Sequence, residues 1–280
     1  MNRYLNILFL WIIVFIGCED KDVKQEFSEV PTSFTKKVLI EEFTGAWCGY
    51  CPIGAYIVES LIEENDNIIG IGVHSGDAME VDHSSFLEMT YQNSGYPSGM
   101  VDRVSYDGYV SLNAGYWTFM ANNRLSSTPP CGLAMRSKVS GGIATIEVHA
   151  GFNATLEGDH RLTVYLIEDH VTGSGYGYDQ ANYYDGDSSS TFYQLGNPIE
   201  EYEHNNTLRA VLSGSLGDPL DNSVLISGGE HVETYTIDIS SYEKNNLHAV
   251  AFIHHVGSSV VDHEILNVQR VSINGFQDWD

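Results

Sequence analysis

Residues 38–52 hold the pattern that most restricts what this chain can fold into. An apolar, strand-like run ends at Phe43, and Cys48 and Cys51 follow it a few residues later. Apolar residues spaced four apart then continue over residues 53–61, which predicts a helix. A strand, a Cys-x-x-Cys pair and a helix in this order are typical of a redox motif, because the start of a helix stabilises a thiolate.

The spacing of the two cysteines suits thiol–disulfide exchange, in which a thiolate attacks a disulfide sulfur. Cys48 is the candidate nucleophile, because unpaired N–H groups at a helix start favour negative charge, and Cys51, one turn later, is the candidate resolving thiol. A static disulfide between Cys48 and Cys51 is the alternative in an exported protein. One such pair supplies too few ligands for a metal site, and Pro52 stands where haem attachment needs His, so neither metal nor cofactor is expected.

Residues 1–17 have the features of an export signal, with Arg3 followed by an apolar stretch. The stretch is shorter than the roughly 20 apolar residues of a transmembrane helix. Gly17 precedes Cys18, and this ending resembles a bacterial lipoprotein signal, which implies that a lipid on Cys18 anchors the chain to a membrane. In the alternative, an ordinary secretory signal, Cys18 is incidental. Either signal places the protein outside the cytoplasm, in the cell envelope, where disulfides persist.

The composition of the next segment and of the whole chain narrows the class of partner. Residues 18–35 are mostly polar and charged, and we expect a flexible tether there. The chain has a formal net charge of −25 and only 13 Lys and Arg residues. Nucleic acid is therefore excluded as a partner, because phosphate binding needs clustered positive charge.

The strand–helix order continues beyond the cysteines. An apolar run at residues 68–73 predicts a buried parallel strand, and helices are expected at residues 84–92 and 112–125. A Gly-Tyr-Pro sequence ending at Pro97 and a hairpin lie between these helices. Together with the Trp-Cys-Gly-Tyr-Cys sequence that begins at Trp47, this order resembles the thioredoxin superfamily.

That resemblance implies an α/β thioredoxin-like domain over residues 36–130 and assigns roles within it. Glu42 aligns with the superfamily's buried acid in the strand before the cysteines, where burial raises the pKa and allows it to accept the proton of Cys51 as a general base. Pro97 aligns with the cis-proline opposite the active site. Substrate contacts are expected at four positions, namely Trp47, Tyr50, Tyr96 and Pro97.

Other stretches narrow the resemblance further. Pro52 departs from ordinary thioredoxins, as does the bulky Tyr96. Two sequence motifs are similar to those of a Bacteroidetes family of outer-membrane lipoproteins named after a twenty-eight-kilodalton outer membrane protein. They are Glu-Glu-Phe-Thr-Gly before the cysteines and Gly-Tyr-Pro-Ser-Gly-Met-Val-Asp-Arg, which ends at Arg103. This resemblance implies an outer-membrane location, and a thioredoxin-like domain followed by a β-rich one.

Residues 131–280 show the period-2 alternation of strands, in about seven segments separated by turn clusters. The segments are 133–139, 144–150, 162–166, 207–212, 232–239, 247–255 and 265–273. We expect an all-β immunoglobulin-like sandwich, separated from the first domain by a Pro-containing boundary at residues 126–130. The connection at residues 169–206 is long and rich in Tyr, Gly and Ser, which predicts a loop that contacts a ligand or partner.

Four further residues have chemistry of their own. His74, Asp77 and His83 lie in or after the loop that follows the second strand, where ordinary polar loop groups are favoured over a metal site. Cys131 is left without a partner, and we expect a buried, inert thiol, with an intermolecular disulfide as the alternative.

Two functions of different classes follow from these patterns. The first is a lipid-anchored thiol–disulfide oxidoreductase of the cell envelope, acting on cysteine-containing envelope proteins or a redox partner, with the β-sandwich recognising partners. The second is an outer-membrane surface binding protein or adhesin in which the thioredoxin-like domain is a non-catalytic scaffold. The reactivity of Cys48 distinguishes them.

Overall fold

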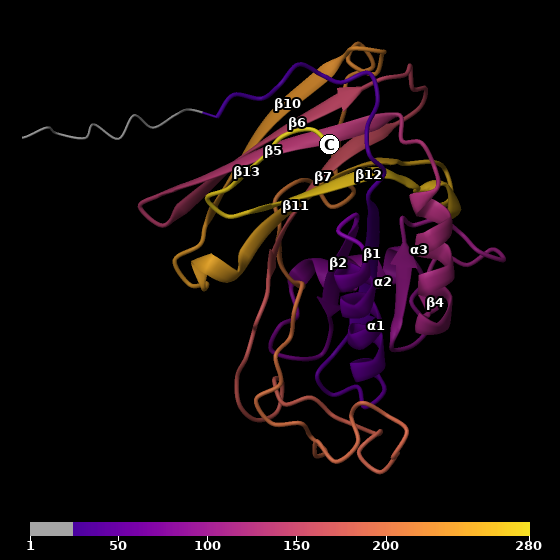
Figure 1. The fold of residues 1–280 in the computed structure, drawn as a ribbon, viewed down its shortest axis with the longest axis vertical. Coiled ribbons are helices and arrows are strands. Elements are labelled where there is room, and N and C mark those ends of the chain that lie inside the picture. Colours follow the sequence, from indigo (N-terminus) through magenta and orange to yellow (C-terminus); the bar gives the residue numbers. More distant parts are fainter. Residues whose placement is uncertain (1–24) are drawn as a thin grey trace, which may run out of the picture.

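Residues 25–280, which the computed structural model describes, form two β-sheets with helices packed around one of them (Figure 1). The larger sheet of this part of the chain has nine strands, in the order β12-β11-β7-β8-β2-β1-β3-β4 with β9 paired to β7, and the smaller has the order β10-β6-β5-β13. The strands before residue 130 are β1 Val38–Thr44, β2 Ile68–His74, β3 Ser98–Val101 and β4 Leu112–Asn113. Those after it are β5 Cys131–Ser140, β6 Ile143–Phe152, β7 His160–Glu168, β8 Thr207–Val211, β9 Asp218–Pro219, β10 Glu230–Asp238, β11 Leu247–His255, β12 Ile265–Ser272 and β13 Phe276–Gln277. The α-helices are α1 Cys51–Glu64, α2 Asp82–Thr90 and α3 Trp117–Leu125.

Strand β1 is buried on both faces because helices cover each side of the sheet around it. Ile40 packs with Val58 of α1 and Trp117 of α3, whereas Phe43 packs on the opposite face with Leu87 of α2. Side chains that alternate along a strand point to opposite faces, so the continuous apolar run of β1 matches its place inside the layers. Strand β1 pairs in parallel with β2 and antiparallel with β3.

The smaller sheet packs on the part of the larger sheet that contains β7 and β11. Ile146 and Val148 of β6 share one apolar core with Leu166 of β7 and Ala251 of β11. Figure 1 shows this two-layered part at the upper end of the molecule. The seven strands predicted after residue 130 are present as β5–β8 and β10–β12, because period-2 alternation places one face of each strand in this core.

The larger sheet runs across the predicted boundary near residue 130. Strand β8 pairs in parallel with β2, where Thr207 lies opposite Gly72, and Gly72 N donates to Asn206 O at 2.8 Å. Strand β8 is also antiparallel to β7. The protein is therefore β-rich, with one mixed sheet that contains strands from both predicted parts. Local sequence patterns did not reveal this pairing, because its two partners are far apart in the chain.

A buried polar cluster joins the start of β1 to β12. Lys36 Nζ lies 2.7 Å from the carboxylate of Asp102, and Arg124 Nε donates to the same carboxylate at 2.8 Å. Lys36 also donates to Leu266 O at 3.0 Å, and Arg124 to Ile265 O at 3.3 Å. These contacts tie the first part of the chain to a strand near its end.

Residues 25–35, the described portion of the predicted flexible tether, belong to the fold. Ser28 Oγ donates to Asp278 at 2.6 Å, and Trp279 Nε1 donates to Ser28 O at 2.9 Å. The Phe34 side chain is buried. The tether prediction therefore does not hold for these residues, because their polar groups are paired with the last residues of the chain, which a local pattern does not show.

The predicted signal at residues 1–17 and the predicted lipidation site Cys18 lie outside the described residues. Among residues 25–280, no helix combines the length and the apolar character needed to cross a membrane.

Candidate functional site

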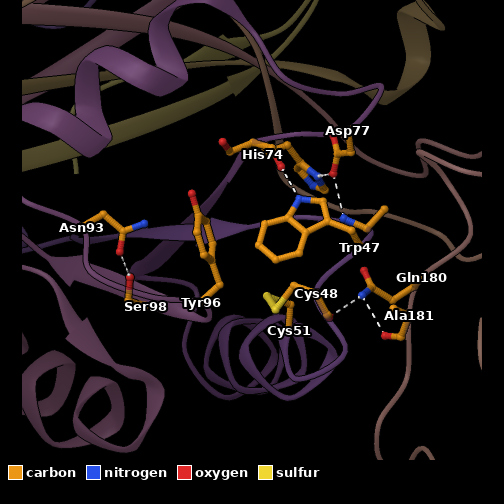
Figure 2. The surroundings of a disulfide bond; sticks show 12 residues. Trp47, Cys48, Cys51, His74, Asp77, Asn93, Tyr96, Ser98, Gln180 and Ala181 are labelled. Atoms are coloured by element: carbon orange, nitrogen blue, oxygen red, sulfur yellow. Dashed lines mark hydrogen bonds and ion pairs between the residues drawn. A yellow bond between two sulfur atoms is a disulfide. The ribbon is translucent and has the colours of Figure 1, made fainter.

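Cys48 and Cys51 form a disulfide where α1 begins, and their Cα atoms are 5.3 Å apart (Figure 2). The helix starts at Cys51, so Cys48 lies in the turn before it rather than at the helix start, and Cys51 N donates to Cys48 O at 3.1 Å. Pro52 occupies the first helical turn, where a proline is tolerated because N–H groups there lack intrahelical partners. Both cysteines are buried, with Cys48 5% and Cys51 1% exposed.

A buried carboxyl group lies close to this disulfide. Glu42 on β1 is 3% exposed, and its Oε1 has no hydrogen-bond partner among residues 25–280. The carboxyl packs against α1 at Gly54, where any added Cβ would overlap Oε1. Burial, and after it the charge of Glu59, raises the pKa of Glu42 well above its usual range. The carboxyl is thereby suited to exchange a proton closer to neutral pH than an exposed glutamate.

A small cavity connects Glu42 with Cys51. Its volume is about 20 Å³, and its polar lining includes Glu42, Glu59, His74, Gln180 and His204 beside Cys51. A cavity of this size holds about one water molecule. Burial, and after it the neighbouring His74, lowers the pKa of His204 to about 4, so this histidine is neutral at pH 7. The cavity therefore gives the carboxyl and the cysteine a shared polar environment.

Trp47 and Tyr96 lie on one side of the disulfide (Figure 2). Trp47 Nε1 donates to Ser75 O at 2.6 Å, and its ring meets Tyr96 edge to face with centroids 5.1 Å apart. The peptide bond from Tyr96 to Pro97 is cis. A Cβ added to Gly54 would lie 2.9 Å from Pro97 Cβ, which places Pro97 against the first turns of α1. The structure thus brings Trp47, Tyr96 and Pro97 together beside the cysteines.

Residues 169–206, here called the strap, cover the other side of the disulfide. Figure 1 shows the strap extending from the β7 end of the molecule to its far end and back. Three of its hydrogen bonds end on carbonyl oxygens of the turn that holds Cys48: Ala181 N to Ala46 O at 2.7 Å, Gln180 Nε2 to Cys48 O at 2.9 Å, and Tyr183 N to Gly49 O at 2.9 Å. The strap is therefore part of the site.

Tyr183 lies directly on Gly49, where any added Cβ would overlap the tyrosine ring. Glycine is thus what lets the strap approach this closely. The Tyr183 ring also meets Tyr50 edge to face, with centroids 5.1 Å apart. Sequence reasoning did not identify Gln180 or Tyr183 as site residues. The Tyr-rich composition marked the strap as a contact loop, but nothing local to it encodes which surface it contacts.

Asp77 links the loop after β2 to the turn before the cysteines. Its Oδ2 accepts hydrogen bonds from Ala46 N and His74 Nδ1, both at 2.7 Å. Burial alone raises the pKa of Asp77, but the hydrogen bonds from His74 and from backbone N–H groups outweigh burial and lower it. His83 instead packs against Phe86. Within the described part of the chain, no three His, Cys, Asp or Glu side chains gather as a metal site.

Cys131 is fully buried and forms no disulfide with any described cysteine. Burial raises the pKa of its thiol to about 12, although the nearby Lys36 opposes the shift. The prediction that this thiol is buried is confirmed.

Fold and site together define a β-rich protein whose mixed sheet carries a Cys-x-x-Cys disulfide at the start of a helix. The model of the outer membrane protein Omp28 family matches residues 84–277, and the chain belongs to this family. The match starts after Cys51, so membership rests on the later part of the chain. It confirms the family resemblance and indicates an association with the outer membrane.

One solved structure, described as HBP35 of Porphyromonas gingivalis, is similar to this chain with a TM-score of 0.67 and 22% sequence identity. The similarity covers 86% of this chain and 76% of that chain. At this identity the likeness concerns the fold. No curated protein matches the chain.

Proposed function

We propose that this protein is a lipid-anchored thiol–disulfide oxidoreductase of the cell envelope, whose thioredoxin-like domain at residues 36–130 acts through Cys48 and Cys51. The observation that carries the proposal is Glu42, whose carboxyl shares a cavity with Cys51 and has an oxygen without a partner among residues 25–280. A disulfide that only cross-links the chain gains nothing from such a carboxyl, because burying a polar group without a partner costs free energy. Thiol–disulfide exchange, in contrast, uses a proton acceptor beside the resolving cysteine.

Cys48, Cys51 and Glu42 have different roles in the proposed thiol–disulfide exchange. In the reduced protein, the Cys48 thiolate attacks one sulfur of a client disulfide, and the other client sulfur leaves as a thiolate. Cys51 gives its proton to Glu42 and attacks Cys48 Sγ, which closes the Cys48–Cys51 disulfide and releases the second client thiolate. Two electrons pass to the client. The reverse sequence, starting from the disulfide, oxidises a client dithiol.

Trapping of clients tests this function. In Cys51→Ser the mixed disulfide on Cys48 cannot be resolved, so client proteins remain attached and are released by a reductant. The double variant Cys48→Ser/Cys51→Ser is the matched control and should trap none. The proposal fails if Cys51→Ser yields no adducts and the wild-type protein neither reduces a test disulfide nor oxidises a dithiol.

The lipid anchor has a separate test. Family membership supports the outer membrane, and the Gly17-Cys18 ending of the export signal supports a lipoprotein. Radiolabelled palmitate should enter the wild-type protein and not Cys18→Ala. Labelling of both proteins would contradict a lipid on Cys18, and labelling of neither would leave an ordinary secretory signal as the explanation.

A second function, surface binding without redox chemistry, is favoured by the exposed tyrosines of the strap. Tyr176 is 90% and Tyr183 61% exposed. Exposed Tyr side chains supply large contact areas at low cost in conformational entropy. A scaffold of this kind should retain its partners in Cys48→Ser/Cys51→Ser and lose them when Tyr176 and Tyr183 are replaced by Ser, whereas the oxidoreductase loses its clients with the cysteines.

A further inference from the structure

Two parts of the chain, residues 38–102 and the strap, build the surface around the disulfide. Figure 2 shows the disulfide with Tyr96 on one side and the strap residue Gln180 on the other. Because the strap is hydrogen-bonded to the turn that carries Cys48, its side chains keep a fixed place at the rim of the site. A client whose sulfur reaches Cys48 therefore meets both parts.

This surface is built without positive side chains. Neither residues 38–102 nor residues 162–208 contain a Lys or an Arg, although Asp and Glu recur in both. Arg270, which borders the base of the strap, is held by Asp169 at 2.6 Å. Clefts lined by one sign of charge raise the local concentration of ligands of the opposite sign.

Exposed carboxylates stand at two places on the rim. Glu80 accepts a hydrogen bond from Gly76 N at 2.8 Å, and a Cβ added to Gly76 would lie 2.9 Å from Trp47 Nε1, so Glu80 belongs to the Trp47 side. Asp187 is exposed on the strap. Hydrogen bonds from Ser189 lower the pKa of Asp187 below its ordinary value.

The surface around the disulfide also carries exposed aromatic rings. Trp47 is 41%, Tyr50 55% and Tyr183 61% exposed. The Tyr50 ring also lies 6.0 Å from Tyr184, whose carbonyl accepts a hydrogen bond from Asp187 N at 2.9 Å, so the rings continue to the strap carboxylate. The faces of exposed aromatic rings attract Lys ammonium and Arg guanidinium groups. The rings and the carboxylates of this surface thus both favour a positively charged ligand.

We propose that the client of the Cys48–Cys51 site is a polypeptide segment whose cysteines are flanked by Lys or Arg. This proposal rests on the proposed function and adds the substrate class. The positive side chains of the client contact Glu80, Asp187 and the aromatic rings while its cysteine reaches Cys48. The same surface repels an anionic thiol.

The chemistry balances with a client dithiol. A client thiolate attacks Cys48 Sγ, the bond between Cys48 and Cys51 breaks, and Cys51 leaves as a thiolate that takes up a proton. The second client thiolate attacks the client sulfur of the mixed disulfide and releases Cys48. The client loses two electrons and forms a disulfide, and the cysteine pair of the protein gains those electrons.

Two matched dithiol peptides test the proposal with the full-length, oxidised protein. Both have the same length and two cysteines, and one has Lys and the other Glu beside each cysteine. We expect oxidation of the Lys peptide to be about tenfold faster or more at low ionic strength, as for other electrostatically steered encounters. Because salt screens exposed charges, the ratio of the two rates should approach one in 1 M NaCl. The rates of each peptide with a small uncharged disulfide are the reference for intrinsic thiol reactivity.

Variants of the protein separate charge from ring contacts. Glu80→Gln/Asp187→Asn should lower the rate ratio, whereas Glu63→Gln/Glu64→Gln, two exposed carboxylates at the other end of α1, should leave it unchanged. Tyr183→Phe should keep the ratio and Tyr183→Leu should reduce it, since only an aromatic face attracts a cation.

The possible results separate the two proposals. Equal rates for both peptides, or a faster Glu peptide, overturn the substrate class and leave the oxidoreductase in place. A ratio that survives 1 M NaCl also overturns it, because the preference is then not electrostatic. If neither peptide reacts and Cys51→Ser traps nothing, the oxidoreductase itself fails.

Discussion

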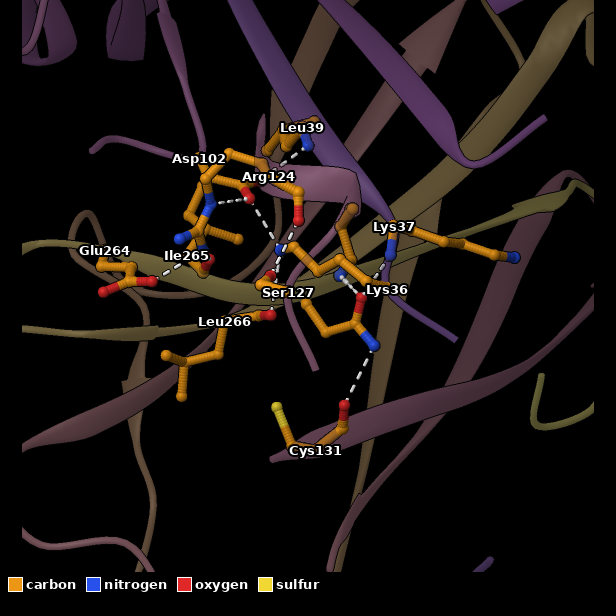
Figure 3. A network of polar contacts seen from close by, with 12 residues as sticks. Lys36, Lys37, Leu39, Asp102, Arg124, Ser127, Cys131, Glu264, Ile265 and Leu266 are labelled. Carbon is orange, nitrogen blue, oxygen red and sulfur yellow. Dashed lines mark hydrogen bonds and ion pairs between the residues drawn. The ribbon is translucent and has the colours of Figure 1, made fainter. Parts of the chain in front are cut away.

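A buried carboxylate lies near each end of strand β1, and the two carboxylates have very different surroundings. Before its first residue, Lys36 and Arg124 converge on Asp102, which is fully buried (Figure 3). Near its last residue lies Glu42, equally deep in the protein, with an oxygen that has no hydrogen-bond partner within residues 25–280. Two positive side chains surround Asp102. Around Glu42, in contrast, residues 38–102 supply no Lys or Arg.

The two carboxylates differ in how their negative charge is matched. Asp102 also accepts a hydrogen bond from Leu39 N at 2.9 Å, so its charge is matched from several directions and it holds the first part of the chain against β12. Glu42 has no cation beside it, its Oε1 has no partner within residues 25–280, and burial outweighs its hydrogen bond with Thr44, so the pKa of Glu42 is raised. The paired carboxylate thus holds two segments of the chain together, whereas the raised pKa of Glu42 suits the proton transfer that we propose for it.

The largest expected effect comes from removing the charge of Asp102. Asp102→Asn keeps the shape and the tolerance for a positive φ, which is 48° here, but leaves Lys36 and Arg124 without their shared carboxylate. Breaking one partner out of a buried ion pair costs about 3–5 kcal/mol. Urea-induced unfolding of the wild-type protein and the variant measures the loss.

Asp107→Asn is the matched control for that experiment. Asp107 is exposed and also has a positive φ, of 51°, so the same substitution tests the backbone effect without the buried pairs. We expect a change within about 0.5 kcal/mol. Similar losses in Asp102→Asn and Asp107→Asn would mean that the buried cluster is not what holds the junction.

Removing the carboxylate of Glu42, at the other end of β1, should stabilise the protein at high pH, whereas removing that of Asp102 destabilises it. The folded-state pKa of Glu42 is raised above its ordinary value of 4.5, so its contribution to stability is complete below that value and is lost as pH rises through the folded-state pKa. Glu42→Gln removes this loss, and the variant should be more stable than the wild-type protein at pH 8.

Unfolding of the oxidised protein at pH 5 and pH 8 checks the sign. The wild-type protein should lose stability between these values relative to Glu42→Gln. Equal changes in both proteins would show that Glu42 does not titrate with a raised pKa, and would remove the observation on which the proposed exchange chemistry depends.

The same contrast explains how much of the site the sequence predicts. Cys48, Cys51 and Glu42 lie within ten residues of one another, on a strand, a turn and a helix whose periods are visible in the chain. The seven later strands were predicted for the same reason, since alternation along a strand is a local property. Local order therefore predicts the elements and the residues that they carry.

The contacts that complete the structure are not local. The pairing of β8 with β2, the packing of residues 25–35 on the end of the chain, and the docking of the strap on Gly49 each join distant segments. The helix start was displaced from Cys48 to Cys51 because hydrogen bonds of the turn, rather than the spacing of apolar residues, decide where α1 begins. Such contacts depend on tertiary packing, which periodicity does not encode.

A smaller effect is expected where the strap meets the turn that carries Cys48. Gly49→Ala places a methyl group where the Tyr183 ring lies, so the strap must move away from the turn. We expect a local destabilisation of about 1 kcal/mol, in the low range for overpacking, seen as faster hydrogen exchange at the amides of Ala181 and Tyr183. Gly186→Ala, on the same strap with no described atom within 4 Å of the new methyl, is the control and should exchange like the wild-type protein.

The smallest effect on stability is expected from the exposed ion pair between Arg124 and Glu264. Arg124 Nη2 lies 2.6 Å from Glu264, whose side chain is 44% exposed, while its Nε donates to the buried Asp102. The Arg124 guanidinium thus makes one buried ion pair, with Asp102, and one solvent-exposed ion pair, with Glu264. Glu264→Gln should cost less than about 1 kcal/mol, because water already solvates that carboxylate and screens its attraction. Urea unfolding should therefore rank Asp102→Asn far above Glu264→Gln, and comparable losses would mean that net charge, rather than burial, governs the contribution of each carboxylate at this end of β1.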